Sequence, residues 1–177
     1  MTKAKGPNYV VHFRRRRKGR TDYQTRLGLL KSGTPRIVVR KTNRFVVVHV
    51  SKNSVKGDQT IAHATSKALK EYGFAGKCNA PSAYLTGFLV GRMAKKAGIS
   101  QVILDIGLHT STQGSIVFCA LKGAIDAGLT SSLNEDKLPK ESRIMGEHIK
   151  AKDDFTKAKQ AIEKASFEKA AKKVDKK

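Results

Sequence analysis

A run of basic side chains near the start of the chain has the clearest potential chemistry. Four consecutive arginines, Arg14–Arg17, are followed by Lys18 and Arg20. A guanidinium can donate two parallel hydrogen bonds to a phosphate and can stack on an unpaired base, so contiguous arginine favours folded RNA more than charge alone does. The same residues also fit a nuclear-localisation signal. We interpret the run as a nucleic-acid contact.

Three aromatic residues interleave with this charge and could stack on bases: Tyr9, Phe13 and Tyr23. The ring of Tyr23 is better explained as the anchor of a helix, which leaves its hydroxyl able to reach a phosphate. Lys41 and Arg44 flank an expected hairpin turn. They are either a solvated edge or an extension of the arginine run into one continuous basic surface.

A lone carboxylate, Asp105, lies in the apolar segment "VILDIGL" and suggests a different chemistry. Two-metal cleavage of phosphodiesters requires several clustered carboxylates. Asp58 and Asp126 are the candidates to join it, and no pattern places either beside Asp105. We therefore interpret Asp105 as a structural, hydrogen-bonded carboxylate. The five histidines have no metal-ligand spacing and no catalytic fingerprint occurs, so we expect neither an enzyme, nor a cofactor, nor a bound metal.

The distribution of charge supports a polyanionic partner. Of the 177 residues, 36 are Lys or Arg and 14 are Asp or Glu, a net charge of +22. Residues 1–50 hold 14 basic residues and one acidic residue, net +13 of that total. An acidic membrane surface would also attract such a segment, but no amphipathic apolar face accompanies it. The apolar stretches are too short to span a bilayer. We expect a soluble, cytoplasmic protein that binds nucleic acid.

The two cysteines, Cys78 and Cys119, have neither CxxC nor Cys/His spacing. Neither a disulfide framework nor a zinc site is therefore expected. Both are predicted to be core or near-core thiols in a reducing compartment.

The first half of the chain predicts an arm, a helix and three strands. Residues 1–13 lack periodicity and indicate an extended arm that orders on a partner. A short helix is expected from a cap at Thr21 to a stop near Gly33. Two β-branched runs around "KTNR" predict a hairpin, and "GDQTIAHATS" predicts a third strand of a meander. A short helix ending at Gly73 should follow.

The second half predicts alternating helices and strands. A helix capped by Asn79 and ended at Gly98 carries Gly87 and Gly91, which we interpret as a close contact of helix on sheet. "SQVILDIGL" predicts a central strand buried on both faces, and "GSIVFCALKGAIDAGL" predicts a helix closing at Gly128. A short helix and turn are expected over residues 138–149.

The expected fold is α/β, a mixed β-sheet with helices packed on its faces. Its predicted parts are a basic arm, residues 1–20, an α/β domain, residues 21–149, and a Lys-rich C-terminal helix or tail, residues 150–177. The terminal helix should carry a sparse apolar stripe, formed by Phe155, Ala158 and Ile162.

Several blocks in one order resemble a known family: "RRRRKGRTDYQTRLGLLKSGTPRIVVRKTN", "NAPSAYLTGFLVGR", "VILDIGL" and "GSIVFCALKGAIDAGL". They are similar to the large-subunit ribosomal protein that binds 5S rRNA, universal family eighteen, in its archaeal and eukaryotic-type form. The resemblance runs from about Pro7 to about Ile149. It implies a ribonuclease H-like α/β scaffold used for RNA binding, which would explain an Asp105 strand without a catalytic cluster.

The resemblance also implies partners and contacts. The partners would be 5S rRNA, 23S rRNA and neighbouring large-subunit proteins of the central protuberance, with no membrane and no small-molecule substrate. A metal-dependent nuclease and a general DNA-binding protein are the alternatives from other classes. The segment after Lys152 has no counterpart in the family pattern. The residues expected to contact RNA are Arg14, Arg15, Arg16, Arg17, Lys18, Arg20, Tyr23, Arg26, Arg36, Lys41 and Arg44.

Overall fold

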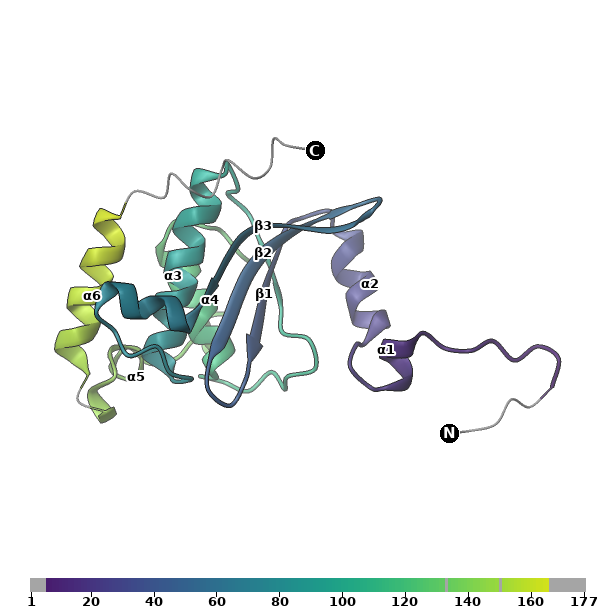
Figure 1. Ribbon diagram of the computed structural model, residues 1–177, viewed down its shortest axis with the longest axis horizontal. Coiled ribbons are helices and arrows are strands. Elements are labelled where there is room, and N and C mark those ends of the chain that lie inside the picture. Colours follow the sequence, from purple (N-terminus) through teal and green to yellow (C-terminus); the bar gives the residue numbers. More distant parts are fainter. Residues whose placement is uncertain (1–5, 133, 150, 166–177) are drawn as a thin grey trace.

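A four-stranded mixed sheet forms the centre of the molecule (Figure 1). The structure, a computed structural model, describes residues 6–132, 134–149 and 151–165. The strand order is β3-β2-β1-β4. The strands are β1 (Arg36–Lys41), β2 (Val46–Ser54), β3 (Gly57–Thr65) and β4 (Ile103–Asp105). The helices are α1 (Arg14–Arg17), α2 (Tyr23–Lys31), α3 (Ala80–Lys96), α4 (Ile116–Asp126), α5 (Glu141–Met145) and α6 (Lys152–Lys164), with short 3₁₀ turns η1 (Ser66–Tyr72), η2 (Glu135–Lys137) and η3 (Glu147–Ile149).

The first three strands form the predicted meander. β1 pairs antiparallel with β2, with Val38 opposite His49, and β2 pairs antiparallel with β3. Alternate side chains of a strand point to opposite faces. Ile37 and Val39 are 0% exposed on the face that carries the core, together with Val46, Val48 and Val50. The alternate residues of β1, Arg36, Val38 and Arg40, therefore lie on the other face.

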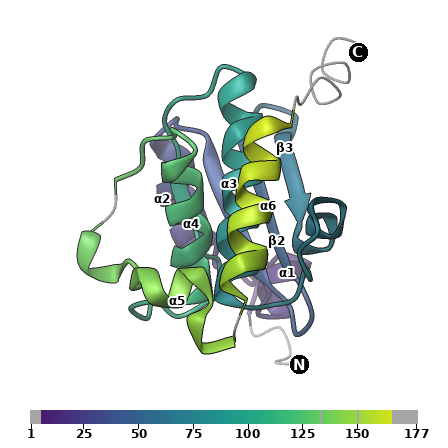
Figure 2. The same ribbon diagram turned by 90° about the vertical axis from the view of Figure 1, so that its left-hand side faces the viewer.

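Helices α3 and α4 pack against each other and cover the core face of the sheet. Figure 2 shows α3 and α4 in front of the sheet, with α6 nearer the viewer and thus on the outer side of α3. The apolar stripe predicted for the terminal helix is confirmed, because Phe155, Ala158 and Ile162 are buried and the ring of Phe155 lies 5.4 Å from that of Tyr84. Helix α2 lies on the opposite side of the sheet (Figure 1). The predicted α/β class, with a mixed sheet and helices packed on it, is confirmed.

The prediction that "SQVILDIGL" forms a central strand buried on both faces was wrong. β4 has only three residues and lies at the edge of the sheet, where it pairs parallel with β1 alone. Its Ile103 and Leu104 are only half-buried. The most buried residue of the apolar run, Val102 at 1% exposed, precedes the strand, so a run of apolar residues indicates burial without fixing which residues pair in a sheet.

The prediction for the two glycines of α3 was also wrong. A Cβ at Gly91 would lie 2.7 Å from the Cβ of Ala127, and a Cβ at Gly87 would collide with the carbonyl of Ala120. Both neighbours belong to α4 or its end, so these glycines permit a close approach of two helices rather than of helix and sheet. Gly123 of α4 meets the backbone of α3 at Tyr84 in the same way.

Three other local predictions are confirmed. Asn79 caps α3 by accepting a hydrogen bond from Ser82 N–H, and Gly73 ends η1 in the left-handed conformation. Cys119 is buried and Cys78 half-buried, both as free thiols. Within the described residues, no helix is long and apolar enough to cross a bilayer.

Candidate nucleic-acid interface

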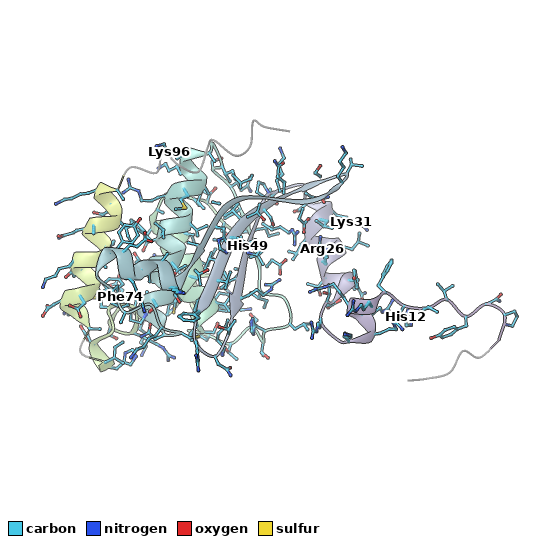
Figure 3. The ribbon with its side chains drawn as sticks, in the orientation of Figure 1. His12, Arg26, Lys31, His49, Phe74 and Lys96 are labelled. Carbon is cyan, nitrogen blue, oxygen red and sulfur yellow. The ribbon has the colours of Figure 1, made fainter. Side chains whose placement is uncertain are left out.

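The arginine run forms a single helical turn, α1, on the surface of the molecule. Its four side chains are exposed, as are those of Lys18 and Arg20. Among them, only Arg15 makes a side-chain hydrogen bond within the described chain, from Nε to Thr21 Oγ1 at 2.7 Å. Sequence reasoning did not predict this turn, because four arginines show no apolar periodicity. The turn holds the guanidinium groups at one end of the protein, with His12 before it (Figure 3).

Helix α2 is capped by Asp22, one residue later than the cap predicted from the sequence at Thr21. The Asp22 carboxylate accepts hydrogen bonds from the N–H groups of Gln24 and Thr25 and from the Thr25 hydroxyl. The Thr25 hydroxyl, followed by the two N–H groups and nearby Arg16, lowers the pKa of Asp22. A carboxylate here also complements the positive end of the helix dipole, which favours Asp22 over Thr21 as the cap.

Tyr23 is half-buried and its ring lies 5.4 Å from that of Phe13. This contact ties the arm to the start of α2 and agrees with the interpretation of Tyr23 as an anchor. No residue of α1 or α2 is buried. The segment is therefore positioned by caps, one aromatic contact and charge.

A chain of ion pairs joins α2 to the open face of the sheet. Arg26 contacts Asp58 at 2.6 Å, and Asp58 also contacts Arg36 at 2.7 Å. Arg36 reaches Asp105 at 2.7 Å, and Asp105 contacts Arg40 at 2.8 Å. Figure 3 shows Arg26 on the side of α2 that faces the sheet. Alternating charges thus bridge α2, β3, β1 and β4.

The expectation that Arg36 contacts RNA does not fit this geometry. Its side chain is 3% exposed, and its two terminal nitrogens donate to Asp105 and Asp58. A guanidinium this buried needs paired carboxylates to offset its lost hydration. Arg36 therefore links Asp58 to Asp105 inside the protein and is not among the proposed RNA contacts.

Asp105 is a structural carboxylate. It accepts hydrogen bonds from Arg36, from Arg40 and from the N–H of Gly107. Burial alone would raise the pKa of Asp105, but the Arg40 hydrogen bond, the nearby arginine charges and the Gly107 N–H outweigh it and hold the pKa below 3.8. Asp58 has a lowered pKa for the same reason, since Arg26 and Arg36 outweigh burial.

The nuclease hypothesis required a cluster of carboxylates. The Arg36 guanidinium lies between Asp58 and Asp105, and Asp126 is elsewhere, bound to Tyr84 and Lys122. Over residues 6–132, 134–149 and 151–165, no group of three or more His, Cys, Asp or Glu side chains could hold a metal ion. Asp58 and Asp105 are thus neutralised by arginine.

A cleft of about 590 Å³ separates α1 and α2 from the end of the sheet. Arg15, Arg20, Tyr23 and Arg26 line one side. The other side is formed where β1 and β4 end, by Arg40, Asp105, Gly107, Leu108 and His109. The structure thus brings four of the predicted contact residues together with Arg40 and His109, which were not among the predicted contact residues. Arg40 could have been noticed because it lies on the same face of β1 as Arg36, four residues away.

The hairpin tip lies next to this cleft. Lys41 and Arg44 are exposed, and the turn between them is closed by hydrogen bonds from the N–H and hydroxyl of Thr42 to the carbonyl of Phe45. Lys41 N–H donates a long hydrogen bond, 3.4 Å, to Nε2 of His109. Burial and the charges of Lys41 and Arg40 lower the pKa of His109. The tip therefore joins the wall of the cleft.

Known proteins match this chain over most of its length. A family model described as ribosomal large subunit proteins 60S L5 and 50S L18 matches residues 7–102 and 93–134. The chain belongs to this family. The large ribosomal subunit protein uL18 of Methanoregula boonei is 51% identical over 149 residues, covering 84% of this chain and 86% of the relative. That of Korarchaeum cryptofilum is 52% identical over 148 residues, covering 82% and 75%.

Membership of the uL18 family identifies the chain as a structural constituent of the large ribosomal subunit, of archaeal type, and not an enzyme. As such it is a cytoplasmic protein that works in translation. The resemblance inferred from the sequence blocks is confirmed.

Proposed function

We propose that this chain binds 5S rRNA and helps attach it to 23S rRNA in the central protuberance, beside neighbouring large-subunit proteins. The supporting observation is the concentration of exposed cations at one end of the molecule. Within the described residues, no acidic side chain forms a salt bridge with any cation between Arg14 and Arg20. Such a surface is suited to a phosphate backbone, whose bound counterions it would release.

The proposed contacts follow the geometry. The arm and α2 supply most of them, and the hairpin tip extends the surface past the cleft. Arg26 is 35% exposed and shares its charge with Asp58, so it would act at the margin. The proposed RNA contacts are Arg14, Arg15, Arg16, Arg17, Lys18, Arg20, Tyr23, Arg26, Lys41 and Arg44.

The test separates charge from guanidinium geometry. Wild type, a variant with Arg14–Arg17 replaced by lysine and one with them replaced by alanine are titrated against 5S rRNA and an unrelated folded RNA over a range of salt. If about 6 phosphates are engaged, wild-type affinity falls roughly a thousandfold between 50 and 200 mM salt. The lysine variant keeps most of this dependence but loses preference for 5S rRNA, because a point charge cannot form the planar fork.

The alanine variant should lose both preference and salt dependence. Equal affinity of wild type for the two RNAs would refute 5S rRNA as the partner. Wild-type affinity indifferent to salt would refute the cationic surface as the means of binding.

A further inference from the structure

Arg40 has an unusual environment for an arginine at an RNA-binding surface. Its Nη1 donates to the carbonyls of Val39 and Asp105, at 2.9 and 2.8 Å, and its Nη2 donates to the Asp105 carboxylate. Three of its five N–H donors are thus used within the protein, and they hold the flat guanidinium in place. Yet 39% of the side chain remains exposed, and it lines the cleft.

Gly107 lies against one flat face of this guanidinium. A Cβ at Gly107 would lie 2.8 Å from Cζ of Arg40 and 3.0 and 3.1 Å from its two Nη atoms. Nearly equal distances, with the central carbon nearest, mean that Gly107 lies over one flat face of the group. The backbone φ of +63° at Gly107 also favours glycine there. One face of the guanidinium is therefore backed by the chain.

The rest of the cleft is lined by apolar side chains and by arginines. Tyr23, Leu29 and Leu108 line it, and Leu108 is 60% exposed. Arg15 and Arg20 belong to the same lining and come from the exposed arm. The volume of about 590 Å³ lies within the range of small-molecule sites, roughly 300 to 1,000 Å³.

We propose that the cleft receives one unpaired nucleotide of the bound RNA, with its base stacked on the guanidinium of Arg40 and against Leu108. Arg15 and Arg20 hold the phosphates that flank this nucleotide. The inference rests on the proposed function, because it supposes that the arm binds RNA. It goes further by naming a site for one unpaired nucleotide. Proteins usually recognise RNA sequence at such unpaired positions. A base within a duplex could not enter, since both its faces are already stacked.

The experiment probes the bases of 5S rRNA with dimethyl sulfate, which methylates exposed adenine N1 and cytosine N3, and with a water-soluble carbodiimide, which modifies exposed uracil N3 and guanine N1. The RNA is probed free, bound to wild type, and bound to two pairs of variants. Arg40→Lys keeps the charge and can still pair with Asp105, but removes the flat surface. Arg143→Lys makes the same change at an exposed arginine of α5, outside the cleft lining and outside the proposed RNA contacts. Leu108→Ala removes an exposed cleft wall, and Leu27→Ala is its control, 54% exposed on α2 and outside the cleft lining.

Wild type should shield at least one unpaired base. Both cleft variants should restore the chemical modification of that same base and weaken binding about fivefold to tenfold, the loss of one stacked base. Their salt dependence should stay as in wild type, and both control variants should behave as wild type. Circular dichroism checks the fold of Arg40→Lys, and Leu108→Ala alters only an exposed side chain.

Two results overturn the cleft site. Either wild type shields no unpaired base, or Leu108→Ala and Arg40→Lys shield the same bases as wild type. Both results leave 5S rRNA affinity and salt dependence intact, so they are distinct from failure of the proposed function, in which wild type shows no preference for 5S rRNA at all.

Discussion

The segment formed by α1 and α2 and the pair formed by α3 and α4 are built on opposite principles. α3 buries 13 of its 17 residues and fits α4 through glycines that admit no side chain. α1 and α2 bury none. Apolar burial holds α3 and α4 together. A capping aspartate, one aromatic contact and an ion-pair chain hold the segment formed by α1 and α2. The segment that carries most of the exposed cations thus contributes least to the core.

This difference separates stability from binding in a way that mutations can test. Changes at α3 and α4 should reduce the free energy of unfolding and leave the RNA surface of the folded molecules intact. Changes at the arm should do the opposite.

Deleting residues 1–19 should have the largest effect on binding. The deletion removes the arginine run and Lys18, and affinity for 5S rRNA at low salt should fall roughly a thousandfold if most of about 6 phosphate contacts are lost. Circular dichroism and cooperative melting should be unchanged. Loss of cooperative melting would show that the arm contributes to the core, and would contradict the separation of binding from stability.

Gly87→Ala should destabilise the protein by about 3 kcal/mol, because the added methyl collides with the Ala120 carbonyl and forces α3 and α4 apart. Chemical denaturation measures the loss. The folded fraction should bind 5S rRNA as wild type does. An unchanged midpoint would mean that the two helices can separate without cost.

Asp105→Asn should cost about 2 kcal/mol at pH 7, since it weakens charged hydrogen bonds to Arg36 and Arg40. Because folding lowers the pKa of Asp105 below 3.8, its contribution is present above that value and is lost as the pH falls through the lowered pKa. The free energy of unfolding of wild type should therefore decline below about pH 4, and less steeply in Asp105→Asn.

The control for this titration is Asp136→Asn, which changes an exposed carboxylate that forms no salt bridge among the described residues. It should keep the wild-type acid profile. Identical profiles for Asp105→Asn and wild type would rule out the ion-pair chain as a source of acid sensitivity.

Gly28→Ala should have the smallest effect and the opposite sign to Gly87→Ala. A Cβ at Gly28 meets no atom within 4 Å, and alanine favours a helix by up to about 1 kcal/mol over glycine. Hydrogen exchange of the α2 amides should slow severalfold with little change in the melting temperature. Faster exchange would show that α2 packs more closely than its exposure indicates.

Local signals in the sequence predicted the elements well. The cap at Asn79, the stops at Gly73 and Gly128 and the β-branched hairpin each depend on residues close together in the chain, so their consequences are visible in the sequence. The edge position of β4 and the pairing of Arg36 with Asp105 depend on residues 69 positions apart. The sequence shows that Arg36 is cationic. Only the fold shows that its charge is paired with Asp58 and Asp105.

The parallel pairing of β1 with β4 has a consequence for synthesis. The meander β1-β2-β3 involves neighbours along the chain, whereas β4 follows β1 by more than 60 residues. Contacts between distant segments form late, since a long loop must close first. As the chain leaves the ribosome that makes it, the arm emerges long before Asp105, Gly107 and Leu108. We expect the nascent arm to bind RNA through its arginines before β4 has docked, and the cleft to add its part of the discrimination among RNAs only afterwards.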